Sequence, residues 1–172
     1  MKTPRRTALT LLAAVTGVAA LSGCATFDDA DVAARVGDRS LTDDQVAAVA
    51  NSPIAEGAVS GGEDGTLDAE VARRIVTVWV RNAALADAPF LAEIDLDDVR
   101  VQLSSELGDA FITADEFSQQ LLIDNAAVST AIQQGLIDEA DAFALVSAAE
   151  VDVDARYGTW DAERLEVVAL GS

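Results

Sequence analysis

The sequence predicts a mainly α-helical domain, a bundle of four to five helices with a small β clasp formed by the N- and C-terminal segments. Apolar residues recur every three or four positions through the middle of the chain, which is typical of amphipathic helices. Near both ends apolar and polar residues alternate, which indicates short strands. Only 5% of the residues are aromatic and many apolar ones are alanine, so we expect a core of small side chains between packed helices.

The N-terminal part of this domain combines a strand with a capped helix. Residues 32–36 are expected to form a short strand followed by a tight turn. A helix near residues 42–51 follows, in which Thr42 is the N-cap and Gln45 completes a capping box. Pro53 ends this helix, since proline disfavours helical geometry in the residue before it.

A small, acidic, glycine-rich loop at residues 53–65 leads to the best-defined helix, residues 67–87. The side chains on its predicted buried face are Leu67, Val71, Ile75, Val78, Asn82 and Leu85. The opposite, polar face is expected to carry Glu70, Arg73, Arg74, Thr77 and Arg81. Trp79 lies beside the apolar stripe, where it either fills the core or forms the wall of a groove.

Three further helices are predicted, and after them the helical pattern stops. Residues 95–107 begin with acids suited to a helix N-terminus. A second capping box, Thr113 with Glu116, is expected to open a helix that ends at Gly135, and a shorter helix covers residues 138–148. After Glu150 the segment "VDVDARYG" alternates, "GTW" is expected to turn, and "RLEVVAL" to close a small hairpin. The two ends of the domain are expected to pair as a clasp.

Residues 1–23 have the pattern of an export signal. Lys2, Arg5 and Arg6 precede an uncharged apolar run that is shorter than a membrane-spanning helix requires. The segment Leu21-Ser22-Gly23-Cys24 resembles the lipobox of bacterial lipoproteins. The resemblance implies cleavage after Gly23 and attachment of a lipid to Cys24; the alternative is an ordinary secretory signal that leaves a free thiol.

Together these features predict three regions: a signal peptide at 1–23, a lipidated N-terminus and tether at 24–31, and one helical domain at 32–172. With the signal removed, eight arginines face 30 acidic residues, a formal charge of −22. Nucleic acid is therefore excluded as an expected partner, because binding a polyanion requires a basic surface. The lipid is expected to hold the protein on the extracytoplasmic face of the cell membrane, since two acyl chains anchor a protein stably.

The residue inventory argues against several kinds of chemistry. The chain has no histidine and a single cysteine, so it cannot assemble Ser/His/Asp or Cys/His nucleophile systems, a disulfide, or a His/Cys zinc site. Adjacent acids such as Asp97-Asp98 are expected by chance among 30 acidic residues and are interpreted as solvated surface. We expect no enzyme, no catalytic residues, no metal site and no cofactor.

Two segments resemble SurA-type periplasmic chaperones and related foldase lipoproteins of the actinobacterial type. The first is "VAARVGDRSLTDDQV", with matching positions Val36, Gly37, Leu41, Thr42 and Val46. The second is "VDVDARYGTWD", with matching positions Val151, Val153, Asp154, Arg156, Tyr157, Gly158 and Trp160, and with Ala155 in place of the usual proline. The chain has no room for the parvulin isomerase domain of many members, so isomerase activity is not part of the expectation.

The resemblance implies a holdase or folding factor whose helical cradle receives unfolded or newly exported polypeptides. The candidate peptide groove consists of the aromatic residues Trp79, Phe90, Phe111, Phe117 and Phe143, each of which has core packing as its alternative role. Arg156, Tyr157 and Trp160 form a candidate C-terminal clasp, with Arg156 paired to helix carboxylates, or else a peptide-binding edge.

Two functional hypotheses follow from these expectations. The first is a lipid-anchored chaperone-like protein that binds unfolded polypeptides without ATP. The second is an accessory or scaffolding lipoprotein whose helical bundle binds a single folded partner in the envelope.

Overall fold

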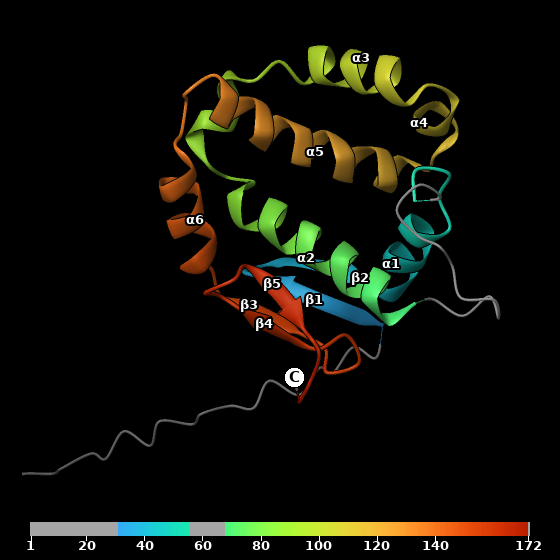
Figure 1. The fold of residues 1–172 in the computed structure, drawn as a ribbon, viewed down its shortest axis with the longest axis vertical. Helices are drawn as coiled ribbons and strands as arrows, with labels where there is room; N and C mark the ends of the chain where they lie inside the picture. Colours follow the sequence, from blue (N-terminus) through green and yellow to red (C-terminus); the bar gives the residue numbers. More distant parts are fainter. Residues whose placement is uncertain (1–30, 56–67, 172) are drawn as a thin grey trace, which may run out of the picture.

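The computed structural model describes residues 31–55 and 68–171, and within these ranges the chain is mainly helical with a small antiparallel sheet (Figure 1). The sheet joins strands from the two ends of the domain, which confirms the predicted fold class. The signal peptide, Cys24 and most of the predicted tether lie outside the described residues, as does most of the glycine-rich loop.

The sheet is centred on β1 (Val32–Val36), which pairs antiparallel with β2 (Arg39–Thr42) on one side and β3 (Val151–Val153) on the other. Arg35 lies opposite Ser40 in one pair and opposite Asp152 in the other. Ala33 and Ala34 are both fully buried. The register of β1 against β2 shifts between Val32 and Ala34, so the regular alternation of side chains is interrupted there.

The predicted hairpin is wrong in its turn: Thr159 and Trp160 lie in a strand, β4 (Thr159–Asp161), which pairs with β5 (Glu166–Val168), whereas β3 pairs with β1. The predicted helix near 42–51 is α1 (Asp43–Ala50), and its capping box is present: the Gln45 amide donates to the Thr42 hydroxyl and the Thr42 amide donates to the Gln45 side chain. The hairpin and α1 both pack against the helix that follows the glycine-rich loop, α2 (Ala69–Leu85).

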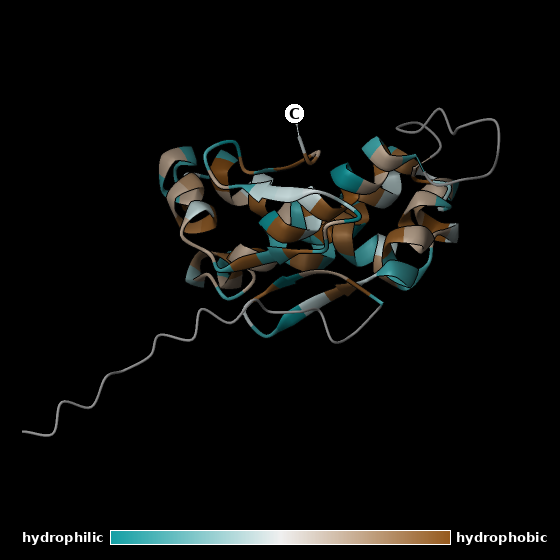
Figure 2. Cartoon of the chain, turned by 90° about the horizontal axis from the view of Figure 1, so that it is seen from below, coloured by the Kyte–Doolittle hydropathy of each residue, from teal (hydrophilic) through white to brown (hydrophobic). Residues whose placement is uncertain are grey.

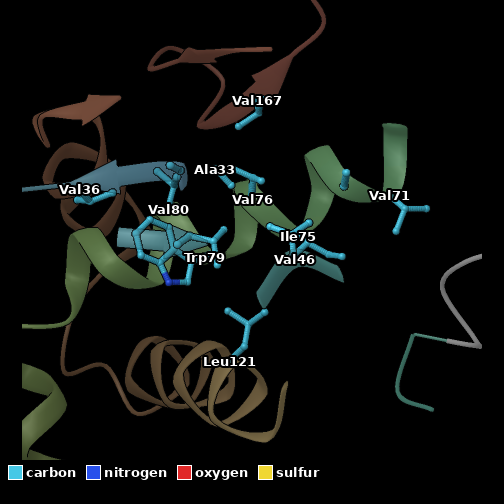
Figure 3. Close-up of a cluster of buried hydrophobic side chains, with 13 residues drawn as sticks. Ala33, Val36, Val46, Val71, Ile75, Val76, Trp79, Val80, Leu121 and Val167 are labelled. Carbon is cyan, nitrogen blue, oxygen red and sulfur yellow. The ribbon is translucent and has the colours of Figure 1, made fainter. Parts of the chain in front are cut away.

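The helix α2 is the central element of the fold, because its residues enter the core on more than one side. Figure 3 shows its side chains Ile75, Val76 and Val80 together with Ala33 of β1 and Val167 of β5. Thr77, which the sequence places on the polar face, is buried. That prediction is wrong because β5 covers this side of α2: the Val167 amide donates to the Thr77 hydroxyl at 2.9 Å.

Replacing Thr77 by valine should destabilise the protein by about 1.5 kcal/mol, because the buried Val167 amide then has no acceptor. Thr77→Ser retains the hydroxyl and is the matched control. Urea unfolding of both variants measures the effect. Equal stability of the two variants would show that the hydrogen bond contributes nothing and that only side-chain shape matters here.

A second layer of helices lies beyond α5 (Glu116–Gln133), which runs beside α2 in Figure 1. On the far side of α5 from the sheet are α3 (Leu96–Leu107) and α4 (Asp109–Thr113). A 3-10 turn, η1 (Pro89–Glu93), connects α2 to this layer, and α6 (Glu139–Ser147) leads back to β3.

The start of α5 differs from the prediction. Thr113 is the last residue of α4, and its hydroxyl donates to the Asp109 carbonyl within that helix, so it does not cap α5. Asp115 is the N-cap instead, with its carboxylate accepting from the Ser118 amide at 3.0 Å. The short elements η1 and α4 were not expected, since five residues are too few to show a helical period.

The buried side chains form two hydrophobic clusters, one between α2 and the strands and one between α5 and the outer helices. Hydrophobic and hydrophilic positions alternate around the helices accordingly (Figure 2). Trp160 of β4 packs against both clusters. The C-terminal hairpin therefore connects the two halves of the core.

Candidate functional site

The five aromatic residues of the predicted groove do not line one common surface. Trp79 is buried in the cluster around α2, and Phe90 and Phe111 are buried in the second cluster. Phe117 is half-buried against the first cluster, whereas Phe143 on α6 is 44% exposed. Because they lie in separate clusters, these five residues do not form a single groove.

A different set of side chains forms an apolar groove between α1, α2 and α5. Its cavity measures about 300 Å³, within the range of small ligand pockets. We call it the α1–α2–α5 groove; its lining residues are Val49, Ile54, Ala55, Val71, Arg74, Ile75, Val78, Ser118, Leu121 and Leu122. Val49, Ile54, Val78 and Leu122 are half-buried, so apolar surface of this groove is accessible to solvent.

Local structure explains why this groove is apolar although two polar residues line it. The Ser118 hydroxyl donates to Asp115 at 2.5 Å, so its donor is already used by the N-cap of α5. Arg74 pairs with Glu70 one turn earlier on α2. Ile54 follows the turn at the end of α1, where the Ser52 hydroxyl accepts from its amide at 3.4 Å.

Sequence reasoning identified part of this groove without recognising it. Val71, Ile75 and Val78 belong to the predicted apolar stripe of α2, and Leu121 lies in the predicted helix that ends at Gly135. Ile54 and Leu122 were missed, because one lies in a turn and the other lies beside the main stripe of its helix. The feature of the sequence that could have indicated the groove is the width of the apolar faces of α2 and α5. Each face is wider than one neighbouring helix covers.

The second predicted site, the C-terminal clasp, is centred on Asp43 at the start of α1. Arg156 Nη1 lies 2.6 Å from Asp43 Oδ2, and the Tyr157 hydroxyl donates to Asp43 Oδ1 at 2.9 Å. Arg156 Nε also lies 2.9 Å from Asp154 Oδ1, which orients the guanidinium. The Arg156 guanidinium carbon is 5.8 Å from the centre of the Tyr157 ring, a cation–π distance.

Charge and burial in this clasp shift the ionisation of its members. The hydrogen bond from Arg156 lowers the pKa of Asp154, against a smaller opposing effect of burial. Burial and the hydrogen bond to Asp43 raise the pKa of Tyr157 to about 12. The clasp therefore combines two acidic side chains, a guanidinium and a phenol that is neutral at pH 7. We interpret this arrangement as part of the fold and not as a catalytic site.

Trp160, the third residue assigned to the clasp, lies apart from this ion pair. It is half-buried in β4 opposite Val167. Its indole nitrogen is buried and has no hydrogen-bond partner among the described residues. The ring therefore contributes to the fold through packing against both clusters.

Asp124 on α5 is an acid in an unfavourable environment. Burial raises its pKa, while a hydrogen bond from the Gln120 side chain at 2.7 Å and the charge of Arg39 lower it by less. A raised pKa in the folded state means that Asp124 costs stability at neutral pH and that this cost disappears below the pKa of the unfolded chain.

We therefore expect Asp124→Asn to raise the melting temperature at pH 7 while having little effect below about pH 3.5, where the parent side chain is protonated in both states. Asparagine keeps the acceptor for Gln120. Thermal unfolding of parent and variant across this pH range measures the difference. A stabilisation that is equally large in acid would contradict the assigned cause.

The described residues contain no group of three or more His, Cys, Asp or Glu side chains placed to hold a metal ion. Within the same ranges, no helix has the length and apolar character needed to cross a membrane.

Comparisons with protein-family models, with curated proteins and with solved structures find no match to this chain. The arguments for function accordingly come from its own residues.

Proposed function

We propose that this protein is a lipid-anchored, extracytoplasmic chaperone-like protein that binds apolar segments of unfolded or newly exported polypeptides. The observation that carries the proposal is the α1–α2–α5 groove, whose lining is almost entirely aliphatic and partly open to solvent. An accessible hydrophobic depression on an otherwise acidic protein is the kind of surface that recognises apolar chain segments. The terminal segments that resemble SurA-type chaperones add to it.

Charge supports the same function. The predicted mature chain carries a formal charge of −22, which opposes self-association and keeps a complex with an apolar client in solution. The lipobox-like segment ending in Cys24 supports a position at the membrane surface, where exported chains emerge. Substrate exchange without ATP then depends on the modest affinity of one shallow groove.

The α1–α2–α5 groove is tested by the double variant Ile54→Asn/Val78→Thr, which makes two half-buried groove positions polar. We expect it to suppress aggregation of a chemically unfolded client about tenfold less effectively than the parent chain, since the loss of each aliphatic contact costs about 0.7 kcal/mol. Light scattering at increasing ratios of full chain to client measures the effect.

The matched control is Val101→Thr/Ile112→Asn, which makes the same chemical changes on α3 and α4. These side chains are 68% and 64% exposed and lie outside the groove. The control should protect the client as well as the parent does. Equal loss of protection in both double variants would show that the groove is not the binding site.

The second candidate function is that of an accessory lipoprotein that binds one folded partner. It is favoured by the exposed apolar side chains of the outer layer, Leu96, Val101, Leu107 and Ile112. Under this function the Val101→Thr/Ile112→Asn variant loses its partner in a pull-down from membranes, whereas the groove variant keeps it. The two double variants therefore separate the two functions.

A further inference from the structure

A second cavity, of about 470 Å³, lies where α2, α5, α6 and the β4–β5 turn meet. Aliphatic side chains from three helices contribute to its lining: Leu85, Val128, Ile132 and Val146. Phe143 of α6 also lines it and is largely exposed, so the cavity has an aromatic side chain at its edge. Its volume is within the range of small-molecule sites.

Two arginines line this cavity, although the predicted mature chain has only eight arginines against 30 acids. The Arg81 Nε donates to the Leu165 carbonyl at 2.7 Å, and within the described ranges Arg81 makes no ion pair. Arg164 pairs with Glu166 at 3.4 Å, and its side chain is 68% exposed. A pair at that distance and exposure is weak. Both guanidinium groups are therefore available to an anion.

The backbone that holds Arg81 is itself unusual. Leu165 has a φ of 54°, the left-handed region that non-glycine residues adopt at a cost. In this conformation its carbonyl accepts from Arg81, which fixes the Nε edge of the guanidinium. Backbone strain of this kind is often found at ligand sites, where it orients a functional group.

We propose that this cavity binds a medium-chain aliphatic carboxylate, with its hydrocarbon chain on the aliphatic lining and its carboxylate at Arg81 and Arg164. Arginine is well suited to this role because its planar fork matches a carboxylate. A peptide terminus fits less well, since its backbone amides need partners inside the cavity. Of the two amide side chains in the lining, that of Asn82 already donates to the Leu121 carbonyl at 3.1 Å. This ligand site is separate from the α1–α2–α5 groove and does not depend on the proposed chaperone-like function.

Glu139 of α6 lines the same cavity, so replacing it should change the affinity for an anion in the opposite direction to replacing Arg81. Its carboxylate repels an anionic ligand, whereas Arg81 attracts one. Arg81→Gln should therefore weaken binding and Glu139→Gln should strengthen it. Damage to the fold can only weaken binding, so tighter binding in Glu139→Gln cannot come from instability.

The experiment is calorimetric titration of the full chain with decanoate below its micelle concentration, with decanol as the uncharged control. We expect saturable 1:1 binding of decanoate, about tenfold weaker in Arg81→Gln and about threefold tighter in Glu139→Gln. Decanol should bind at least tenfold more weakly than decanoate. The Ile54→Asn/Val78→Thr variant should bind decanoate as the parent does.

Three results would overturn the proposal. Equal affinities for decanoate and decanol would show that the arginines do not contribute to binding. Changes of the same direction in Arg81→Gln and Glu139→Gln would show that charge at this cavity does not select the ligand. Loss of decanoate binding in the groove variant, with Arg81→Gln unaffected, would place the ligand in the α1–α2–α5 groove instead.

Discussion

Replacing Gly158 by alanine should destabilise the protein by about 4 kcal/mol and lower its melting temperature by about 10 °C or more. Gly158 has a φ of 133°, a conformation that L side chains rarely adopt. A Cβ at this position lies 2.1 Å from the Val168 carbonyl oxygen. This is a backbone atom, so no side-chain rotation can relieve the overlap. The substitution therefore forces β4 and β5 apart, and the hairpin packs against both hydrophobic clusters through Trp160.

Gly135→Ala is the matched control for this effect. Gly135 follows α5 with a φ of 71°, but a Cβ there meets nothing within 4 Å. Its cost should be about 1 kcal/mol, the conformational strain alone. Thermal unfolding of the two variants measures both contributions. A similar loss in each would show that the close approach of Gly158 to β5 is relieved by a small backbone shift.

Removing the Asp43 carboxylate with Asp43→Ala should cost about 2 to 3 kcal/mol, the second largest effect that we expect. The change removes hydrogen bonds from both Arg156 and Tyr157, and bonds to charged groups are stronger than neutral ones. The expected loss of stability is not larger because the Arg156 side chain is 52% exposed, and solvent screens its charge. Urea unfolding of the full chain measures the loss.

Asp44→Ala provides the control, because Asp44 is the next acid in the first turn of α1 and is exposed. It shares with Asp43 the favourable interaction with the helix N-terminus, which contributes about 0.5 kcal/mol. The difference between the two variants therefore reports the clasp alone. If both variants lose the same stability, the contacts of Asp43 with Arg156 and Tyr157 do not stabilise the fold.

The clasp also predicts a direction of pH dependence. Arg156 holds the pKa of Asp154 below its usual range, so the folded state binds this proton less readily than the unfolded chain does. The corresponding stability is complete above the unfolded pKa, about 3.9, and is lost as the pH falls through the lower, folded value. In Arg156→Gln this part of the acid sensitivity should be smaller but not lost, because the backbone amide of residue 156 still donates to Asp154.

Most of the helical fold was predictable because its signals are local. The capping box of Thr42 and Gln45 and the apolar period of α2 each involve residues a few positions apart. The pairing of β1 with β3 was predictable from alternating text at both ends, although more than 100 residues separate the strands. Its register was not, because alternation alone allows shifts by two residues.

The errors occurred where distant segments decide the environment of a residue. Thr77 reads as a surface position within its helix, and only the hairpin some 90 residues later buries it. Pairing of Arg156 with a helix carboxylate was expected, but the sequence did not indicate that the acid is Asp43, because Arg156 and Tyr157 lie more than 100 residues away from it. Thr113 and Asp115 both match N-cap preferences, and the intervening α4 determines which of them caps α5.

The candidate binding site was harder to predict than the fold. Large aromatic residues are natural candidates for a peptide groove, but here most of them pack inside a core that consists mainly of small side chains. The exposed apolar surface comes from aliphatic residues such as Ile54 and Leu122, where α1, α2 and α5 meet and no other element of residues 31–55 and 68–171 covers them. A groove of this kind depends on the angles between helices, which residue spacing does not reveal.

Binding of unfolded chains in the α1–α2–α5 groove is measured by titrating the full chain with one client in two forms. Reduced, carboxymethylated α-lactalbumin is permanently unfolded, and the native protein is its folded counterpart. Calorimetry should show saturable binding of the unfolded form alone, weakened about tenfold in Ile54→Asn/Val78→Thr and unchanged in Val101→Thr/Ile112→Asn. Absence of binding to the unfolded form, or binding that the groove variant leaves unchanged, would contradict the account.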